Sequence, residues 1–179
     1  MRLWIAGVTL TLGLPAAALA DITVRPGTRS HVLQASGPRI VVYEGAPPQG
    51  TSNGANDTRL GVRIYERPFG DPFAAVAAQE LYEITFKRAA GPAAAQRRRR
   101  EMELTSHAVE SLVAARFYGR DLAAYERVEA TGMVRYPHLR GLSQDEIVAG
   151  MRGKRAQAER WVRDNDALIR RLVAYRFPG

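Results

Sequence analysis

A glutamate in the middle of an apolar helix face is the feature that most constrains what this chain can fold into. Apolar side chains recur at the spacing of one helix face, at Phe73, Val76, Ala77, Leu81 and Ile84. Glu80 falls at the centre of this stripe. Because a carboxylate that faces a core must be paired, metal-bound or functional, the stripe predicts a buried polar site.

A second helical run, residues 101–110, carries its own row of ionisable side chains. Their spacing of i, i+4 and i+7 places three of them on one side: Glu103, His107 and Glu110. On the first helix, Gln79 and Glu83 are one turn apart and flank Glu80. If the two helices pack as an antiparallel pair across residues 91–92, both polar rows face the same space.

The order of patterns along the chain predicts an α+β fold. Residues 21–67 are β-rich and loop-rich, with strands expected at 31–35, 39–44 and 60–66 and an exposed loop at 45–57. Residues 60–66 alternate, with Val62 and Ile64 on one face and Arg63 and Tyr65 on the other. We expect these strands to form a small antiparallel sheet or hairpin.

Residues 71–179 are helical, with about five helices expected at 71–89, 93–118, 121–130, 143–153 and 154–176. Asp71 is the expected cap of the first helix, and Ser143 with Glu146 predicts a capping box at the start of the fourth. No long linker divides the region, so residues 21–179 are predicted to form a single α+β domain.

The first twenty residues have the pattern of a secretory signal peptide. Arg2 precedes an apolar stretch that ends in the small-residue sequence Ala18-Leu19-Ala20. The sequence therefore predicts an exported protein, periplasmic or secreted, with no stable membrane insertion after signal cleavage. The chain has no cysteine, so neither disulfides nor thiolate ligands are available. Its formal net charge is +8, but the predicted export makes nucleic acid an unexpected partner.

The region from residue 60 to 118 resembles a small zincin-like metallopeptidase. The resemblance rests on the strand at 60–66, the helical segment Gln79-Glu80-Leu81-Tyr82-Glu83, and a second helix with acids. In that family two histidines four residues apart bind zinc, and the glutamate after the first histidine is the general base. Here QELYE stands in place of the HExxH motif.

The resemblance implies roles for individual residues. Glu80 matches the catalytic base, and Gln79 and Glu83 match the two zinc-binding histidines. A later metal ligand would come from Glu103, His107 or Glu110. An active protein of this type would use a divalent metal such as zinc to hydrolyse a peptide or peptidoglycan bond. Because an amide oxygen is a weak zinc ligand, the substitution at Gln79 predicts a degenerate or inactive motif.

The same residues also allow a purely structural interpretation. Glu80 would then form a buried ion pair with an arginine such as Arg63 or Arg116. Glu83 and Lys87 have the spacing of a helical ion pair. His107 would be an ordinary hydrogen-bonded helix histidine, and the acids of residues 103 and 110 would be solvated.

A run of four arginines supports a second functional hypothesis, a non-enzymatic protein of the cell envelope. Arg97, Arg98, Arg99 and Arg100 form a dense positive patch at a helix start. Guanidinium groups bind phosphate or carboxylate in a bidentate manner, so the patch predicts binding to peptidoglycan or another anionic envelope polymer. A solvated charge run is the structural alternative.

Overall fold

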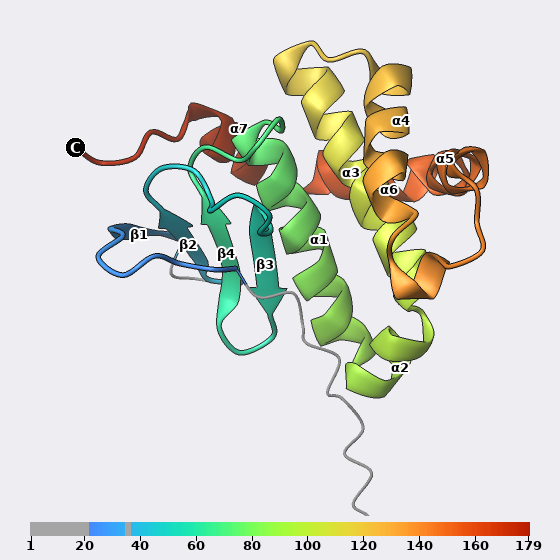
Figure 1. The fold of residues 1–179 in the computed structure, drawn as a ribbon, viewed down its shortest axis with the longest axis horizontal. Coiled ribbons are helices and arrows are strands. Elements are labelled where there is room, and N and C mark those ends of the chain that lie inside the picture. The colour runs from blue at the N-terminus through green and yellow to red at the C-terminus, as the bar shows by residue number, and fades with distance from the viewer. Residues whose placement is uncertain (1–21, 35–36) are drawn as a thin grey trace, which may run out of the picture.

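The computed structural model describes residues 22–34 and 37–179, and its fold class is α+β as expected (Figure 1). The predicted signal peptide, residues 1–20, lies outside the described residues. The elements in chain order are β1 (Ser30–Gln34), β2 (Ile40–Tyr43), β3 (Gly54–Asp57), β4 (Gly61–Tyr65), α1 (Phe73–Ala90), α2 (Pro92–Arg97), α3 (Arg99–Tyr118), α4 (Leu122–Met133), the 3-10 helix η1 (Pro137–Leu139), α5 (Gln144–Gly153), α6 (Arg155–Asp164) and α7 (Asp166–Ala174).

The four strands form a mixed sheet in the order β1-β2-β4-β3 rather than the antiparallel sheet expected from sequence. β2 and β4 are parallel neighbours, with Ile40 opposite Val62 and Val42 opposite Ile64. This arrangement arises because β3 and β4 form a hairpin whose second strand enters the sheet beside β2. The inward side chains of both central strands are fully buried, as the alternation in β4 indicates.

The strand β3 corrects the prediction that residues 45–57 form one exposed loop. Gly54 and Ala55 are buried, and the strand pairs with β4 at the sheet edge. A Cβ atom on Gly54 would lie 3.2 Å from the Glu80 side chain and 3.3 Å from Val76. The glycine therefore permits α1 to approach the sheet edge closely, which brings β3 to the predicted polar helix face.

Helix α1 lies between the sheet and the remaining helices, as Figure 1 shows. It packs on β3 and β4 on one side and on α3 on the other. Ten of its residues are buried, including Glu80 and Glu83. Helix α3 is enclosed to a similar degree, because α1, α4, α5 and α6 all pack against it. Residues 102–111 of α3 are accordingly all buried, whether apolar or polar.

The helix boundaries differ from the sequence-based expectation at two breaks. The expected helix at 93–118 divides into α2 and α3 at Arg98, and the expected last helix divides into α6 and α7 at Asn165. The helical part therefore has seven α-helices rather than about five. The capping box at Ser143 and Glu146 is present at the start of α5. Asp71, expected to cap α1, makes no cap; Pro72 occupies that position.

None of the helices in the described part of the chain combines the length and the apolar character that a bilayer crossing needs.

The turn between β3 and β4 allows a test of the sheet arrangement. Gly61 has φ +92°, and a Cβ atom there would overlap the backbone carbonyl of Arg39. We expect Gly61→Ala to lower the free energy of unfolding by about 2 kcal/mol or more. Gly132→Ala in α4 is the matched control, since a Cβ atom added at Gly132 would meet nothing within 4 Å. This control should raise stability by up to about 1 kcal/mol. Equal effects in urea unfolding would contradict the assigned turn.

Candidate functional site

The polar rows of α1 and α3 face each other across the contact between the two helices. Gln79 Nε2 lies 3.3 Å from His107 Nε2, and the Ser106 hydroxyl lies 3.1 Å from Glu83 Oε1. The ionisable residues of the two rows are buried, since each of them is at most 7% exposed: Glu80, Glu83, Glu103, His107 and Glu110. The expected convergence of the ionisable groups is therefore present, and the acids of α3 are not solvated.

The first part of this region is a carboxylate cluster, which we define as Glu80, Glu83 and Glu103. Asn56, on the edge strand β3, donates from Nδ2 to both Glu80 Oε2 and Glu83 Oε2. The Lys87 ammonium group is 3.2 Å from Glu83 Oε2 and 2.8 Å from Asn56 Oδ1. The predicted helical ion pair of Glu83 and Lys87 is thus formed, and both of its members are also hydrogen-bonded to Asn56 of the sheet.

Burial and mutual repulsion keep protons on this cluster. Burial, together with the neighbouring charge of Glu83, raises the pKa of Glu80 to about 8. The same two causes, in the same order, raise the pKa of Glu103 to about 7. Arg99 lies 3.4 Å from Glu103 and offsets only part of this effect. Glu80 is therefore a protonated acid near neutral pH.

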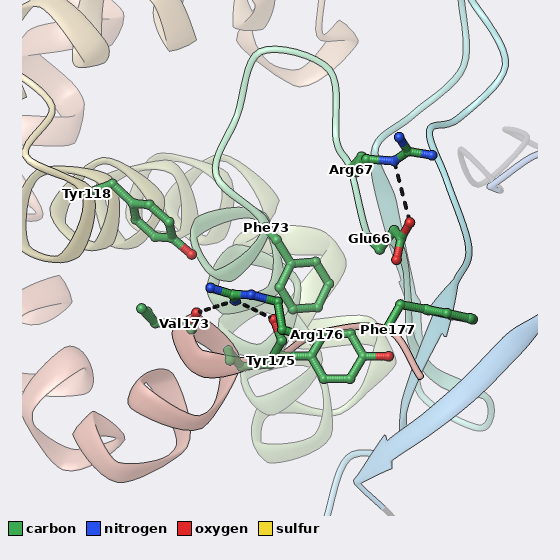
Figure 2. Close-up of a pocket in the computed structure, with 9 residues that line it drawn as sticks. Glu66, Arg67, Phe73, Tyr118, Val173, Tyr175, Arg176 and Phe177 are labelled. Atoms are coloured by element: carbon green, nitrogen blue, oxygen red, sulfur yellow. Dashed lines mark hydrogen bonds and ion pairs between the residues drawn. The ribbon is translucent and has the colours of Figure 1, made fainter. Parts of the chain in front are cut away.

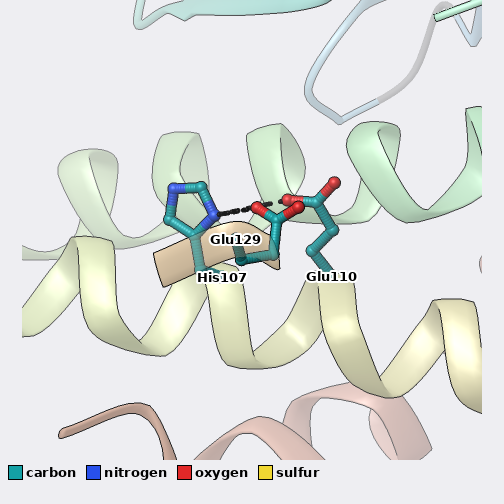
Figure 3. A group of neighbouring side chains, drawn as sticks. All are labelled: His107, Glu110 and Glu129. Carbon is teal, nitrogen blue, oxygen red and sulfur yellow. Dashed lines mark hydrogen bonds and ion pairs between the residues drawn. The ribbon is translucent and has the colours of Figure 1, made fainter. Parts of the chain in front are cut away.

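The second part is a histidine cluster, which we define as His107, Glu110 and Glu129 (Figure 3). His107 Nδ1 lies 2.7 Å from Glu129 Oε2 and 3.4 Å from Glu110 Oε2. Glu129 comes from α4, whereas the other two residues are one turn apart on α3. One potential ligand atom from each residue lies within 4.8 Å of those from the other two.

The two carboxylates and the imidazole of the histidine cluster perturb one another strongly. Burial alone would lower the pKa of His107, but hydrogen bonds to Glu110 and Glu129 outweigh it and raise the pKa well above its usual value. Burial and the charge of Glu129 raise the pKa of Glu110 to about 8. The cluster therefore holds more acid groups than its single imidazole can neutralise.

A hydrogen-bonded chain supports the histidine cluster from outside. The Tyr125 hydroxyl on α4 lies 3.3 Å from Glu110 Oε1 and 2.9 Å from Asp71 Oδ1. Asp71 in turn accepts from Asn53 Nδ2 at 2.9 Å. This accounts for the missing helix cap, because the Asp71 side chain is turned toward α4. Burial raises the pKa of both Asp71 and Tyr125.

Gln79 joins the two clusters. Its amide nitrogen lies 3.3 Å from His107 Nε2 and 3.5 Å from Glu83 Oε1. We call Gln79 and the two clusters together the polar seam. It contains all three residues of α1 that the metallopeptidase resemblance singled out. Glu80 and Glu83 belong to the carboxylate cluster, together with Glu103 of α3. His107 and Glu110 belong to the histidine cluster.

Two parts of the site were not predicted from sequence. Glu129 lies in the predicted third helix with no pattern around it that indicates a buried role, and Asn56 lies in a segment expected to be a loop.

Arg116, one of the two arginines expected as a partner for Glu80, instead pairs with Asp166 at 3.0 Å. His138, which is on η1, has its Nε2 3.6 Å from Glu103 Oε1 and so borders the carboxylate cluster.

A hollow of about 330 Å³ lies at the N-terminal end of α1 and shares no residue with either cluster (Figure 2). Its walls combine aromatic residues, among them Phe73, Tyr118 and Tyr175, with charged and aliphatic ones. Arg176 donates hydrogen bonds to the carbonyls of Val173 and Tyr175, both within the C-terminal segment itself. None of the buried acids lines this hollow.

Comparison with protein-family models, with curated proteins and with solved structures found no match for this chain.

The raised pKa values predict how stability depends on pH. Glu80, Glu103 and Glu110 bind a proton more tightly in the folded than in the unfolded chain, as does His107. Their contribution is therefore present at about pH 4 and is lost as the pH rises through about 7 to 8. We expect the free energy of unfolding to fall from about pH 5 to about pH 8, measured by urea unfolding.

Glu80→Gln should reduce this pH dependence, because it removes one of the titrating groups while keeping an acceptor for Asn56. The exposed Glu159 on α6 provides a control, and Glu159→Gln should leave the dependence unchanged. Stability that rises with pH over the same range would contradict the assignment of protonated buried acids.

Proposed function

We propose that this protein is an exported, zincin-like protein that binds a divalent metal ion without efficient hydrolytic activity. The observation that supports the proposal best is the histidine cluster, in which an imidazole nitrogen and two carboxylate oxygens lie within 4.8 Å of one another. These are common ligand types for zinc and related first-row metal ions. The proposed export rests on the signal-peptide pattern of residues 1–20.

The distances within the cluster are compatible with such an ion. Two metal–ligand bonds of about 2.1 Å at a tetrahedral angle separate their ligand atoms by about 3.4 Å. His107 Nδ1 lies 3.4 Å from Glu110 Oε2, which equals this separation, and 2.7 Å from Glu129 Oε2, which is shorter. A bound divalent ion would replace the shared protons and supply the positive charge that the carboxylates lack.

The surrounding contacts are of the kind that hold metal ligands in place. Tyr125 supports the Glu110 carboxylate, and Gln79 contacts the ring nitrogen of His107 that points away from the cluster. Such outer contacts set the orientation and basicity of metal ligands. In this proposal Gln79 has an orienting role, rather than the ligand role that the family motif implies.

The position of Glu80 argues against a hydrolase. A general base must be ionised and close to the water that a metal would activate. Glu80 has a pKa of about 8, and its hydrogen-bond partner is Asn56 of the sheet edge. The strongest electrostatic influences on its pKa come from Glu83, Lys87 and Glu103, all outside the histidine cluster. We therefore propose a binding role rather than peptide or peptidoglycan hydrolysis.

Zinc titration of chelator-free protein tests the proposal. We expect calorimetry to detect one site per chain, and zinc at about 100 times its Kd should raise the free energy of unfolding by about 2.7 kcal/mol. His107→Gln and Glu129→Gln should each weaken binding by about tenfold or more. Glu80→Gln and the exposed control Glu159→Gln should bind normally. No binding, together with no effect of chelator on stability, would reject the proposal.

Tyr125→Phe tests the supporting contact to the cluster. Removing the hydroxyl should weaken zinc binding by about tenfold, because Glu110 loses a partner that orients it. Tyr82→Phe is a matched control, since the hydroxyl of that buried tyrosine bonds to Gln157 on α6 and to no member of the histidine cluster. Equal zinc affinities for the two variants would remove the proposed role of Tyr125.

A further inference from the structure

We propose that a basic hollow at the junctions of α2 with α3 and of α5 with α6 binds a phosphoryl group. The hollow has a volume of about 330 Å³. It is lined by Arg97, Arg98, Arg100, Glu101, Leu104 and Lys154. Four cationic side chains thus surround one carboxylate, and they come from two segments that are far apart in the sequence. This inference does not depend on metal binding.

The four arginines of the run make different contacts. Arg99 pairs with Glu103 of the carboxylate cluster, although its side chain stays partly exposed. The other three arginines line the hollow. Arg99 therefore has a structural contact, whereas Arg100, in the same helix α3, lines the hollow together with Arg97 and Arg98.

Two guanidinium groups in the hollow have no anionic partner within the described part of the chain. Glu101 is occupied by Arg98, at 2.9 Å, and by Lys154, at 3.5 Å. The Arg98 guanidinium also lies over the Phe86 ring, 4.9 Å from its centroid. Arg97 and Arg100 remain exposed, and neither guanidinium group has an ion pair or hydrogen bond at contact distance among residues 22–34 and 37–179. Arg100 acts on Glu146 only at longer range, where its charge adds to the hydrogen bonds from Ser143 that lower the pKa of that carboxyl group. The charges of the Arg97 and Arg100 guanidinium groups are therefore not neutralised by an ion pair, and both groups line the same hollow.

The chemistry of these side chains favours a phosphoryl ligand. Each guanidinium can donate two parallel hydrogen bonds to the oxygens of one phosphoryl group. A phosphoryl group presents several oxygens in different directions, so it can accept from arginine and lysine side chains on different walls. Lys154 contributes a point charge from the second segment, and Leu104 forms an apolar wall. The phosphoryl group could belong to a membrane lipid headgroup or to a soluble phosphate compound.

The experiment compares two double variants that change the net charge equally. Arg97→Gln with Arg100→Gln removes the two unpaired guanidinium groups of the hollow. Arg160→Gln with Arg163→Gln removes two exposed arginines of α6 that do not line it. Inorganic pyrophosphate, titrated by calorimetry, represents the soluble source. Phosphatidylcholine vesicles with and without phosphatidylglycerol, measured by co-sedimentation, represent the lipid source.

We expect the full chain to bind at least one probe and the hollow variant to bind it about tenfold more weakly, with less than about a twofold change in the α6 variant. Added salt should weaken the binding. Vesicle binding that requires phosphatidylglycerol would identify a lipid headgroup, and pyrophosphate binding alone would identify a soluble ligand.

Two outcomes would overturn the inference. Equal weakening in both double variants would mean attraction by net charge alone, and absence of binding to both probes would mean that the hollow is a solvated charge cluster. His107→Gln should leave the binding unchanged, so failure of the metal proposal would not affect this result.

Discussion

The packing of α1 on α3 is the contact on which the rest of the structure depends. Both helices lie inside the molecule, α1 against the sheet and α3 among four other helices. Neither helix has a wide solvent-facing side along its central turns, so their acids are withdrawn from water together. An isolated buried carboxylate is very unfavourable, and the fold avoids this by protonation and by polar partners from other elements. Asn56, Lys87 and Tyr125 are such partners.

These partners divide the polar seam into two chemically different parts. The carboxylate cluster is held by an amide and an ammonium group, and burial raises the pKa of Glu80 to about 8 and that of Glu103 to about 7. The histidine cluster has an imidazole in contact with two carboxylates from two helices. Only the second part combines the nitrogen and oxygen ligands that suit a zinc-like ion. Glu80, the centre of the motif that resembles the family, thus belongs to the carboxylate cluster and is not a member of the histidine cluster, where the metal is proposed to bind.

The distribution of positive charge on the surface is a second feature of the molecule. The net charge of +8 says little about function by itself, because charge spread evenly over a surface attracts anions only weakly. The tertiary structure concentrates part of it, since Lys154 at the start of α6 lies beside the arginines of the α2–α3 junction. Binding of the proposed phosphoryl ligand would therefore depend on this hollow, whose wall residue Leu104 is next to Glu103 of the carboxylate cluster.

Local patterns were sufficient to predict the fold class, the capping box of α5, the alternation in β4 and the polar faces of α1 and α3, because periodicity and capping depend on near neighbours in the chain. Three expectations were wrong: the antiparallel sheet, the single helices across Arg98 and Asn165, and the loop at residues 54–57. In each case the observed structure depends on packing between segments that are distant in the sequence. Glu129 carries no local signal of its role; it joins His107 only because α4 folds back on α3. The sequence alone therefore predicted a buried polar site around Glu80. The tertiary structure decided that the acids of α3 are buried as well and which groups neutralise them, because the partner of a side chain depends on which elements pack together and not on its neighbours in the chain.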